Sequence, residues 1–263
     1  MTGGRLKALA KADLLVDAAV KGLEALCHAH SVPESHGVGH ALRVLHHVDQ
    51  ALARGRPLPE GRTQAVRLAA LLHDADDRKL FGSKAENARE IMTHIGAEPK
   101  IIGDVEHMIG LVSCSANGNS VPEAALAAPE LLWPRWADRL EATGIIGIIR
   151  CWQFNNETGA PLVLPDTPRP RSEEEVWQFA SSERFERYQT SGGKSRSMLD
   201  HYYDKLLRVA CPPMEVVQNA YLEEEMANRS KPLVDICLAY GESGSLPLND
   251  DIIEQMKASL PFY

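Results

Sequence analysis

The 263-residue sequence has few cysteines and no long apolar segment. Its five cysteines are an odd number, are widely scattered and form no C-x-x-C pair, which predicts reduced thiols that mostly fill the core. No apolar run reaches the roughly 18 residues that a membrane span needs. The first residues, MTGGRLKALAKADLL, lack the apolar core of a signal peptide. We therefore expect a cytoplasmic protein that does not bind a membrane.

Basic residues are also in short supply. The chain has 28 Lys and Arg against 36 Asp and Glu, so its formal net charge is -8. Capture of polymeric nucleic acid relies on clustered basic side chains, and this balance argues against it. A small anionic substrate remains compatible with the charge, because a local basic pocket or a metal ion can override the overall sign. The expected partner is a small molecule, and a homodimer through the C-terminal helices is one option.

No segment alternates apolar and polar residues as a β-strand does. Apolar residues instead recur at helical spacing, and the run TQAVRLAALLHDA begins with Thr63 as the expected N-cap. Residues 155–172, rich in proline and polar residues, read as a long inserted loop. Without a repeat or a clear boundary, we predict an all-α fold in a single domain over 1–263. The predicted helices are 5–30, 40–53, 63–75, 84–95, 99–112, 134–152, 197–210, 214–228 and 231–240.

The strongest chemical signal is LAALLHDADDRKLFG, residues 68–82. An apolar helix ends there in His73 and Asp74, and an imidazole and a carboxylate at one helix end can bind the same divalent metal. Two further residues strengthen the signal. His40 lies on the helix expected to precede this one, and Asp138 lies within the apolar run WPRWADRLEATGIIGIIR, where an unpaired carboxylate is costly. Together they supply two nitrogens and two oxygens for one metal.

The stretch SHGVGHALRVLHHV contains a competing pair, His36 and His40, spaced i,i+4 as in a zinc protease. The glutamate of H-E-x-x-H is absent, and Gly37 and Gly39 weaken a helix at this point. His107, within an apolar helical run, is expected to be a hydrogen-bonded core histidine. The tryptophans at 133, 136 and 152 are also expected in the core.

The ordered motifs HGVGHALRV (36–44), LLHDADDRKLF (71–81), ADRLEATGIIGIIR (137–150) and LDHYYDKLLRV (199–209) resemble those of the HD-domain phosphohydrolase superfamily. The similar branch is that of the bacterial HD-type nucleoside triphosphate pyrophosphohydrolases. The resemblance covers about residues 10–230. It implies a single HD-type helical domain with a motif-bearing core of about 10–210, C-terminal helices over 211–240 and a tail from 241 to 263.

By position, the resemblance implies His40, His73, Asp74 and Asp138 as ligands of one divalent metal, and it leaves His36 at the mouth of the site. Mn²⁺ is the expected ion, with Mg²⁺, Fe²⁺, Co²⁺, Ni²⁺ and Zn²⁺ as alternatives. The implied reaction converts a (d)NTP to a (d)NMP and pyrophosphate.

Other residues of these motifs have expected roles in catalysis or substrate binding. Asp77 is the candidate general base, and Lys79 is a candidate to neutralise phosphate charge. The arginines 43 and 139 could grip phosphate oxygens, since a guanidinium offers two parallel donors. Tyr203 and Lys205 could close over the substrate.

The sequence departs from the family pattern at three places: Gly37 and Glu141 replace aspartate, and Trp136 stands where the family usually has an acidic residue. A second metal would need extra histidines, and His94 and His107 are not where such a pair is expected. Three other functions remain open: a 5'-nucleotidase acting on (d)NMP, an HD-type di-iron oxygenase and a non-catalytic nucleotide-binding protein.

Overall fold

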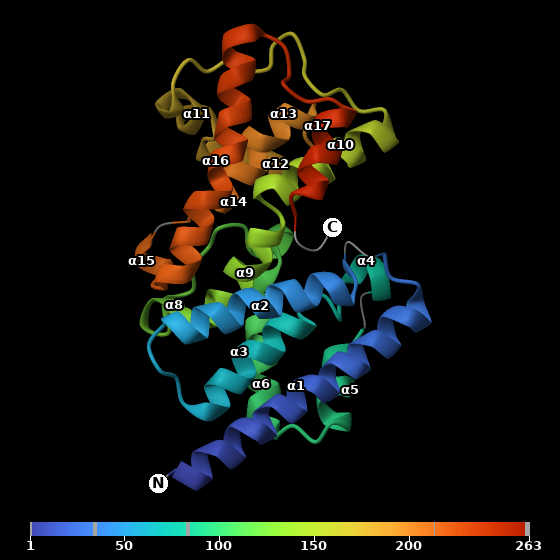
Figure 1. The fold of residues 1–263 in the computed structure, drawn as a ribbon, viewed down its shortest axis with the longest axis vertical. Helices are drawn as coiled ribbons and strands as arrows, with labels where there is room; N and C mark the ends of the chain where they lie inside the picture. Colours follow the sequence, from blue (N-terminus) through green and yellow to red (C-terminus); the bar gives the residue numbers. More distant parts are fainter. Residues whose placement is uncertain (1, 34–35, 83–84, 213, 261–263) are drawn as a thin grey trace. The chain divides into compact units, whose positions relative to one another are not determined.

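The computed structural model describes residues 2–33, 36–82, 85–212 and 214–260. Every regular element in these ranges is a helix, and they contain no β-strand, which confirms the predicted all-α fold (Figure 1). None of the described helices combines the length and the apolarity needed to cross a membrane.

The chain forms two compact units. The first comprises Met1–Asp138 and Met214–Leu222, and the second comprises Arg139–Pro213 and Glu223–Tyr263. The single domain over 1–263 stays a prediction.

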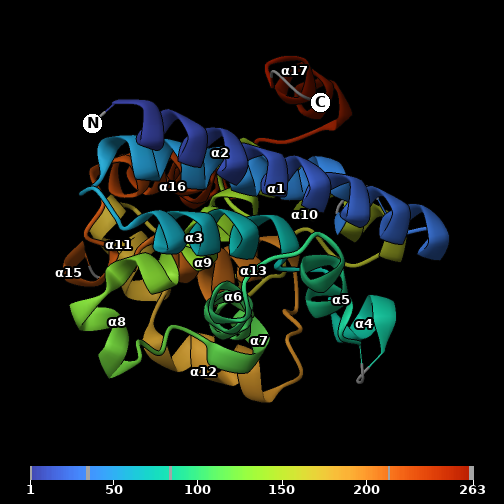
Figure 2. The same ribbon diagram turned by 90° about the horizontal axis from the view of Figure 1, so that it is seen from below.

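Helix α3 (Glu60–Leu72) is central to the first unit, where it packs against α1 (Thr2–His30), α2 (Val38–Arg54) and α6 (Pro99–Val112) (Figures 1 and 2). Helix α3 is buried along most of its length, and nearly all of its buried residues are small or branched apolar side chains. The remaining elements of this unit are α4 (Arg78–Phe81), α5 (Asn87–His94), α7 (Cys114–Asn117), α8 (Glu123–Ala127), η2 (Pro129–Leu132), the start of α9 (Trp133–Glu141) and α15 (Met214–Val217).

Polar contacts fix α3 against its neighbours. The Arg67 guanidinium on α3 lies 2.7 Å from Asp13 Oδ1 on α1 and 2.7 Å from Asp49 Oδ1 on α2. The expected N-cap Thr63 is wrong, because α3 begins at Glu60, and Thr63 already donates its backbone N–H to the Pro59 carbonyl oxygen at 2.9 Å. An acidic residue in the first turn, Glu60, suits the positive end of the helix dipole.

Residues 214–222 are far along the chain but complete the first unit. Asn219 accepts from the backbone N–H of Tyr221 and Leu222 and donates its side-chain N–H to the Ala51 carbonyl oxygen at 2.9 Å. The Tyr221 hydroxyl lies 2.6 Å from His47 Nδ1, so this buried histidine is satisfied. A Cβ on Gly55 would lie 2.9 Å from Asn219 Nδ2, which shows how closely the segment packs.

The second unit is built around the helical stretch Met198–Ala210, which comprises α13 (Met198–His201), the π-helical η3 (Tyr202–Leu206) and α14 (Leu207–Ala210). Its buried face shares one core with α10 (Gly144–Thr158) and α16 (Ala220–Ser243). The other helices are α11 (Glu173–Phe179), α12 (Ser182–Thr190) and α17 (Asp250–Ala258).

The single helix predicted over 134–152 is wrong, because the chain breaks between α9 and α10. Gly144 has φ +66°, a conformation that favours glycine, and it packs against Arg229. The Arg229 Nη1 donates to the Leu140 carbonyl oxygen at 2.6 Å and lies 3.4 Å from the buried Glu141 carboxylate. Arg229 therefore satisfies a backbone carbonyl group at the C-terminal end of α9. The separate helices predicted over 214–228 and 231–240 are also wrong: α15 ends at Val217, and α16 runs from Ala220 to Ser243 with Pro232 inside it.

The predicted loop over 155–172 begins only after Thr158, because α10 extends to that residue. It is fixed at both ends. Backbone N–H groups of Met198 and Leu199 donate to the carbonyl oxygens of Pro161 and Leu162 at 3.0 Å each. Farther along, the Arg169 guanidinium donates to the Gly241 carbonyl oxygen near the end of α16. The segment is thus an anchored part of the second unit.

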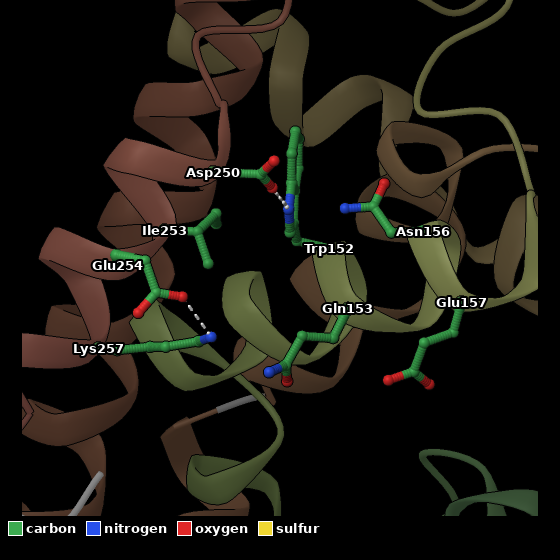
Figure 3. Close-up of a pocket in the computed structure, with 8 residues that line it drawn as sticks. All are labelled: Trp152, Gln153, Asn156, Glu157, Asp250, Ile253, Glu254 and Lys257. Carbon is green, nitrogen blue, oxygen red and sulfur yellow. Dashed lines mark hydrogen bonds and ion pairs between the residues drawn. The ribbon is translucent and has the colours of Figure 1, made fainter.

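The tail has a structural role in covering α10. Helix α17 packs on α10, and Trp152 Nε1 donates to Asp250 Oδ1 at 3.1 Å (Figure 3). A hollow of about 210 Å³ lies between the two helices, with Lys257 paired to Glu254 at 2.7 Å on its α17 side. The buried Trp152 confirms the core position expected for this tryptophan, as do Trp133 and Trp136 in the first unit.

Candidate metal centre

The residues His40, His73, Asp74 and Asp138 meet in the first unit although they come from three parts of the chain. His40 Nε2 on α2 lies 3.1 Å from His73 Nε2 and 3.8 Å from Asp74 Oδ2. Asp138 Oδ1 on α9 lies 3.3 Å from His40 Nε2 and 3.5 Å from His73 Nε2. His73 and Asp74 follow directly after α3, with 3.4 Å between Nε2 and Oδ2. Four donor atoms therefore face one small space.

Local structure orients each histidine. His73 caps the C-terminal end of α3, and its Nδ1 lies 2.8 Å from the Ala70 carbonyl oxygen. An Nδ1–H that donates to this carbonyl leaves Nε2 as the unprotonated atom in the neutral ring, which is the form that binds a metal. His40 lies in the first turn of α2 and is buried.

Burial and charge both act on the titrating groups of this cluster. Burial by itself lowers the pKa of His73, but the carboxylates of Asp74 and Asp138 outweigh it and raise that pKa well above its ordinary value. Burial raises the pKa of Asp138, yet hydrogen bonds from His40 and His73 hold it well below the usual range. The pKa of Asp74 is lowered in the same way, chiefly by His73 against the effect of burial. These shifts favour ionised carboxylates beside a positively charged His73.

The donor set fits a divalent cation. Donors held about 2.1 Å from one ion at 90–109° are about 3.0–3.4 Å apart, close to the separations between these atoms. Among the described residues, His40, His73 and Asp74 form the group whose donor atoms all lie within 4.8 Å of one another, and Asp138 extends it. The two carboxylate side chains are 25% and 30% exposed, so the cluster opens to solvent on their side.

The acidic residues after the HD pair have different surroundings. The Asp76 carboxylate accepts from the backbone N–H of Ala88 at 3.4 Å and caps the start of α5. Its pKa is raised by burial, which those backbone N–H groups only partly offset. Asp77 precedes α4, and its carbonyl oxygen accepts from the N–H of Phe81 at 2.9 Å. The Lys79 side chain lies outside the described part of the structure, so its catalytic role stays a prediction, as does that of Asp77.

The predicted substrate residues are divided between the units. In the first unit His36 is exposed, with its ring centroid 6.3 Å from that of His40, and Arg43 is half-buried on α2. The other three belong to the second unit. Arg139 is buried, and Tyr203 is fully buried, with its hydroxyl donating to the Pro168 carbonyl oxygen at 3.4 Å. Lys205 is half-buried. Their part in substrate binding stays a prediction.

Some features of the centre were not predicted from the sequence. The Ala70 carbonyl could have been found, because it lies three residues before His73 at a helix end. The thiol of Cys27 gave no sequence signal, although it lies close to the start of α2; burial raises its pKa, and the backbone N–H of Val38 opposes this.

The prediction for His107 is wrong: it lies on the exposed face of α6, while Val105 and Met108 face the core.

Solved structures with the same architecture include an HD-superfamily hydrolase from Bacillus thuringiensis, with a TM-score of 0.60 and 17% identical residues. The match covers 89% of this chain and 98% of that one. A protein from Lactobacillus plantarum gives a TM-score of 0.59 with 19% identity, covering 88% of this chain and 97% of that one. No known family profile matches the sequence.

The chain thus shares the fold of an HD-superfamily hydrolase, and His40, His73, Asp74 and Asp138 come together in its first unit. Among curated proteins, the uncharacterized protein L803 of Acanthamoeba polyphaga mimivirus is 37% identical over 220 residues, which is 78% of this chain and 88% of the viral protein. The chain belongs to the same family as L803.

Proposed function

We propose that the protein is a divalent-metal-dependent phosphohydrolase that acts on nucleotides and converts a (d)NTP to a (d)NMP and pyrophosphate. The observation that carries this proposal is the convergence of two imidazole nitrogens and two carboxylate oxygens on one partly exposed space. A mixed N/O set of this kind suits Mn²⁺ and related divalent ions and leaves coordination positions for water and substrate. The order of the HD motifs supports the phosphohydrolase class.

His40, His73, Asp74 and Asp138 would hold the ion. When bound, a divalent ion would supply a water of lowered pKa and polarise a phosphoryl oxygen. The chain's own residues would do the rest. Asp77, three residues after Asp74, would accept a proton from the attacking water. Arg43 and Lys79 would neutralise phosphate charge, and His36 would line the mouth of the site.

The metal content of the purified chain, followed by an ion-exchange assay of dNTPs with added Mn²⁺, tests this proposal. We expect about one metal per chain and equal amounts of dNMP and pyrophosphate, both lost in Asp138→Asn. Release of orthophosphate from dNMP would indicate a 5'-nucleotidase instead. Two irons per chain with oxygen consumption would indicate an oxygenase. Bound metal with nucleotide-induced thermal stabilisation and no product would indicate a binding protein.

A further inference from the structure

Helices α3 and α6 pack side by side in the first unit (Figures 1 and 2), and a hollow of about 370 Å³ lies at their starts. We call it the α3–α6 hollow. Its charged lining residues are Arg62, Glu98, Lys100 and Asp104, and Pro59 and Ile101 line its apolar part. None of these residues lies in the four motifs that resemble the HD family. The resemblance therefore gives the hollow no role.

Arg62 is the unusual residue of the hollow. Its side chain is only 28% exposed, yet its guanidinium makes no hydrogen bond to any described residue. Nη1 lies 3.8 Å from Asp104 Oδ1 and Nε lies 3.8 Å from Glu130 Oε1, beyond the roughly 2.7–3.2 Å of an N–H···O bond. Glu130 already accepts from Arg56 at 2.9 Å. By contrast, Arg67 on the same helix donates to two carboxylates at 2.7 Å each. The N–H donors of Arg62 are therefore available to a ligand.

Backbone donors lie beside this guanidinium. Pro59 and Glu98 precede α3 and α6, and no side chain caps either helix start. The backbone N–H groups of Gly61, Arg62 and Lys100 consequently have no acceptor among the described residues. These groups would not select a ligand on their own, because most helix starts have them. Here they add donors to those of the arginine.

The balance of charge decides the class of ligand. Two cations and two carboxylates line the hollow, so their formal charges sum to zero. Within the described ranges, Glu98 and Lys100 make no ion pair. A simple anion would face the two carboxylates, and a simple cation would face Arg62 and Lys100. A ligand that carries both charges close together satisfies both sides.

We propose that the α3–α6 hollow binds a free α-amino acid with an apolar side chain. The carboxylate and the ammonium of such a ligand are attached to one carbon, which suits a guanidinium and a carboxylate 3.8 Å apart. Arg62 would hold the ligand carboxylate through paired N–H donors, and Asp104 would accept from the ammonium. Pro59 and Ile101 would contact the ligand side chain, in a volume typical of small-molecule sites. The site does not rest on the phosphohydrolase proposal, because it shares no residue with the metal centre.

Isothermal titration of the full chain with L-leucine tests the site. The protein is first treated with a chelator, so that the amino acid cannot bind through a metal. We expect one site with a Kd below about 1 mM. Two analogues test the need for both charges: 4-methylpentanoate lacks the ammonium, and L-leucinamide lacks the carboxylate. Each should bind at least about tenfold more weakly than L-leucine, because each loses a charged hydrogen bond.

Two variants and a matched control locate the effect. Arg62→Gln and Asp104→Asn should each raise the Kd for L-leucine at least about tenfold. Neither side chain has a close protein partner to lose in the hollow, so the urea midpoint should stay near that of the parent. Arg89→Gln is the control, because Arg89 pairs with Glu106 on α6 and does not line the hollow. Its Kd should equal that of the parent.

The proposal would be overturned if L-leucine, L-valine and L-phenylalanine all failed to bind at about 10 mM, by titration or by ligand-observed NMR. Binding of 4-methylpentanoate as tight as that of L-leucine would also overturn it, since the hollow would then be a plain anion site. So would an unchanged Kd in Arg62→Gln. If that variant unfolds early, the comparison of analogues on the parent protein decides. A failed dNTP assay leaves this proposal untouched, and a failed titration leaves the phosphohydrolase proposal untouched.

Discussion

The Nε2 atoms of His40 and His73 lie 3.1 Å apart, although 33 positions separate the residues in the chain. Two imidazole nitrogens at this distance, flanked by two carboxylates, would share a cation. We expect His73→Ala and Asp74→Ala each to lower the affinity for Mn²⁺ at least about tenfold, because each removes one ligand of a preformed set. Isothermal titration of chelated protein with Mn²⁺ measures the change.

Asp76 offers a matched control within the same acidic run. Its carboxylate accepts from the backbone at the start of α5, and an asparagine oxygen can do the same. We expect Asp76→Asn to bind Mn²⁺ with an affinity within about twofold of the parent. If Asp76→Asn lost the metal as fully as Asp74→Ala, the assignment of these neighbouring carboxylates to different tasks would be wrong.

Removing the Tyr221 hydroxyl should destabilise the first unit without affecting metal binding. In Tyr221→Phe, the buried His47 loses its 2.6 Å hydrogen bond to the Tyr221 hydroxyl, and the loss of such a bond costs about 0.5–1.5 kcal/mol. Urea unfolding should show a lower midpoint with an unchanged slope. We expect metal content equal to that of the parent, because His47 and Tyr221 are not among the proposed ligands.

Two glycines of the first unit should respond to alanine in opposite directions. A Cβ on Gly55 would meet the Ala51 carbonyl oxygen at 2.7 Å and the Asn219 side chain at 2.9 Å, so Gly55→Ala should lower the free energy of unfolding by about 1–3 kcal/mol. Gly103, inside α6, has nothing within 4 Å of that position. Gly103→Ala should raise stability by up to about 1 kcal/mol. Denaturation of both variants side by side checks the contrast.

His201 should make stability depend on pH. Its pKa falls from 6.5 to about 3 on folding, so between these values the unfolded chain binds the proton and the folded chain does not. The contribution is fully present above pH 6.5 and is lost on acidification, at about 1.4 kcal/mol per pH unit at most.

Urea unfolding in acetate and MES buffers at pH 5.0 and 6.5 tests this dependence. We expect the free energy of unfolding to fall by about 1–2 kcal/mol more for the parent than for His201→Asn, which cannot take up the proton. If the free energy of unfolding fell equally in the two proteins, groups other than His201 would cause the pH dependence. The Tyr188 and Lys205 side chains, which face His201, are kept in both proteins.

Helices with one apolar face were predictable, because the spacing of their apolar residues matches the spacing of their buried residues. Helix α6 matches its predicted bounds of 99 and 112, and α2 and α1 differ from theirs by a few residues. The break after Glu141 was not predictable: it depends on Arg229, which reaches back 89 positions to the Leu140 carbonyl oxygen. Local propensity contains no information on such a partner.

The HD pair and its convergence with His40 and Asp138 followed from ordered motifs. The surroundings of Asp76 and His107 did not, because the sequence does not say which of several adjacent polar residues faces the core. In α6, neighbouring residues point in different directions, so His107 is exposed while Met108 is buried.

The unit with the metal centre is assembled from two stretches of sequence, and this has a consequence for its synthesis. Residues Met214–Leu222 supply the Asn219 and Tyr221 contacts to α2, yet they leave the ribosome about 75 residues after Asp138. A nascent chain that already contains every proposed ligand would still lack one wall of its own unit. We therefore expect chains truncated near residue 138 to fold poorly. We also expect the first unit to finish folding late during synthesis of the chain.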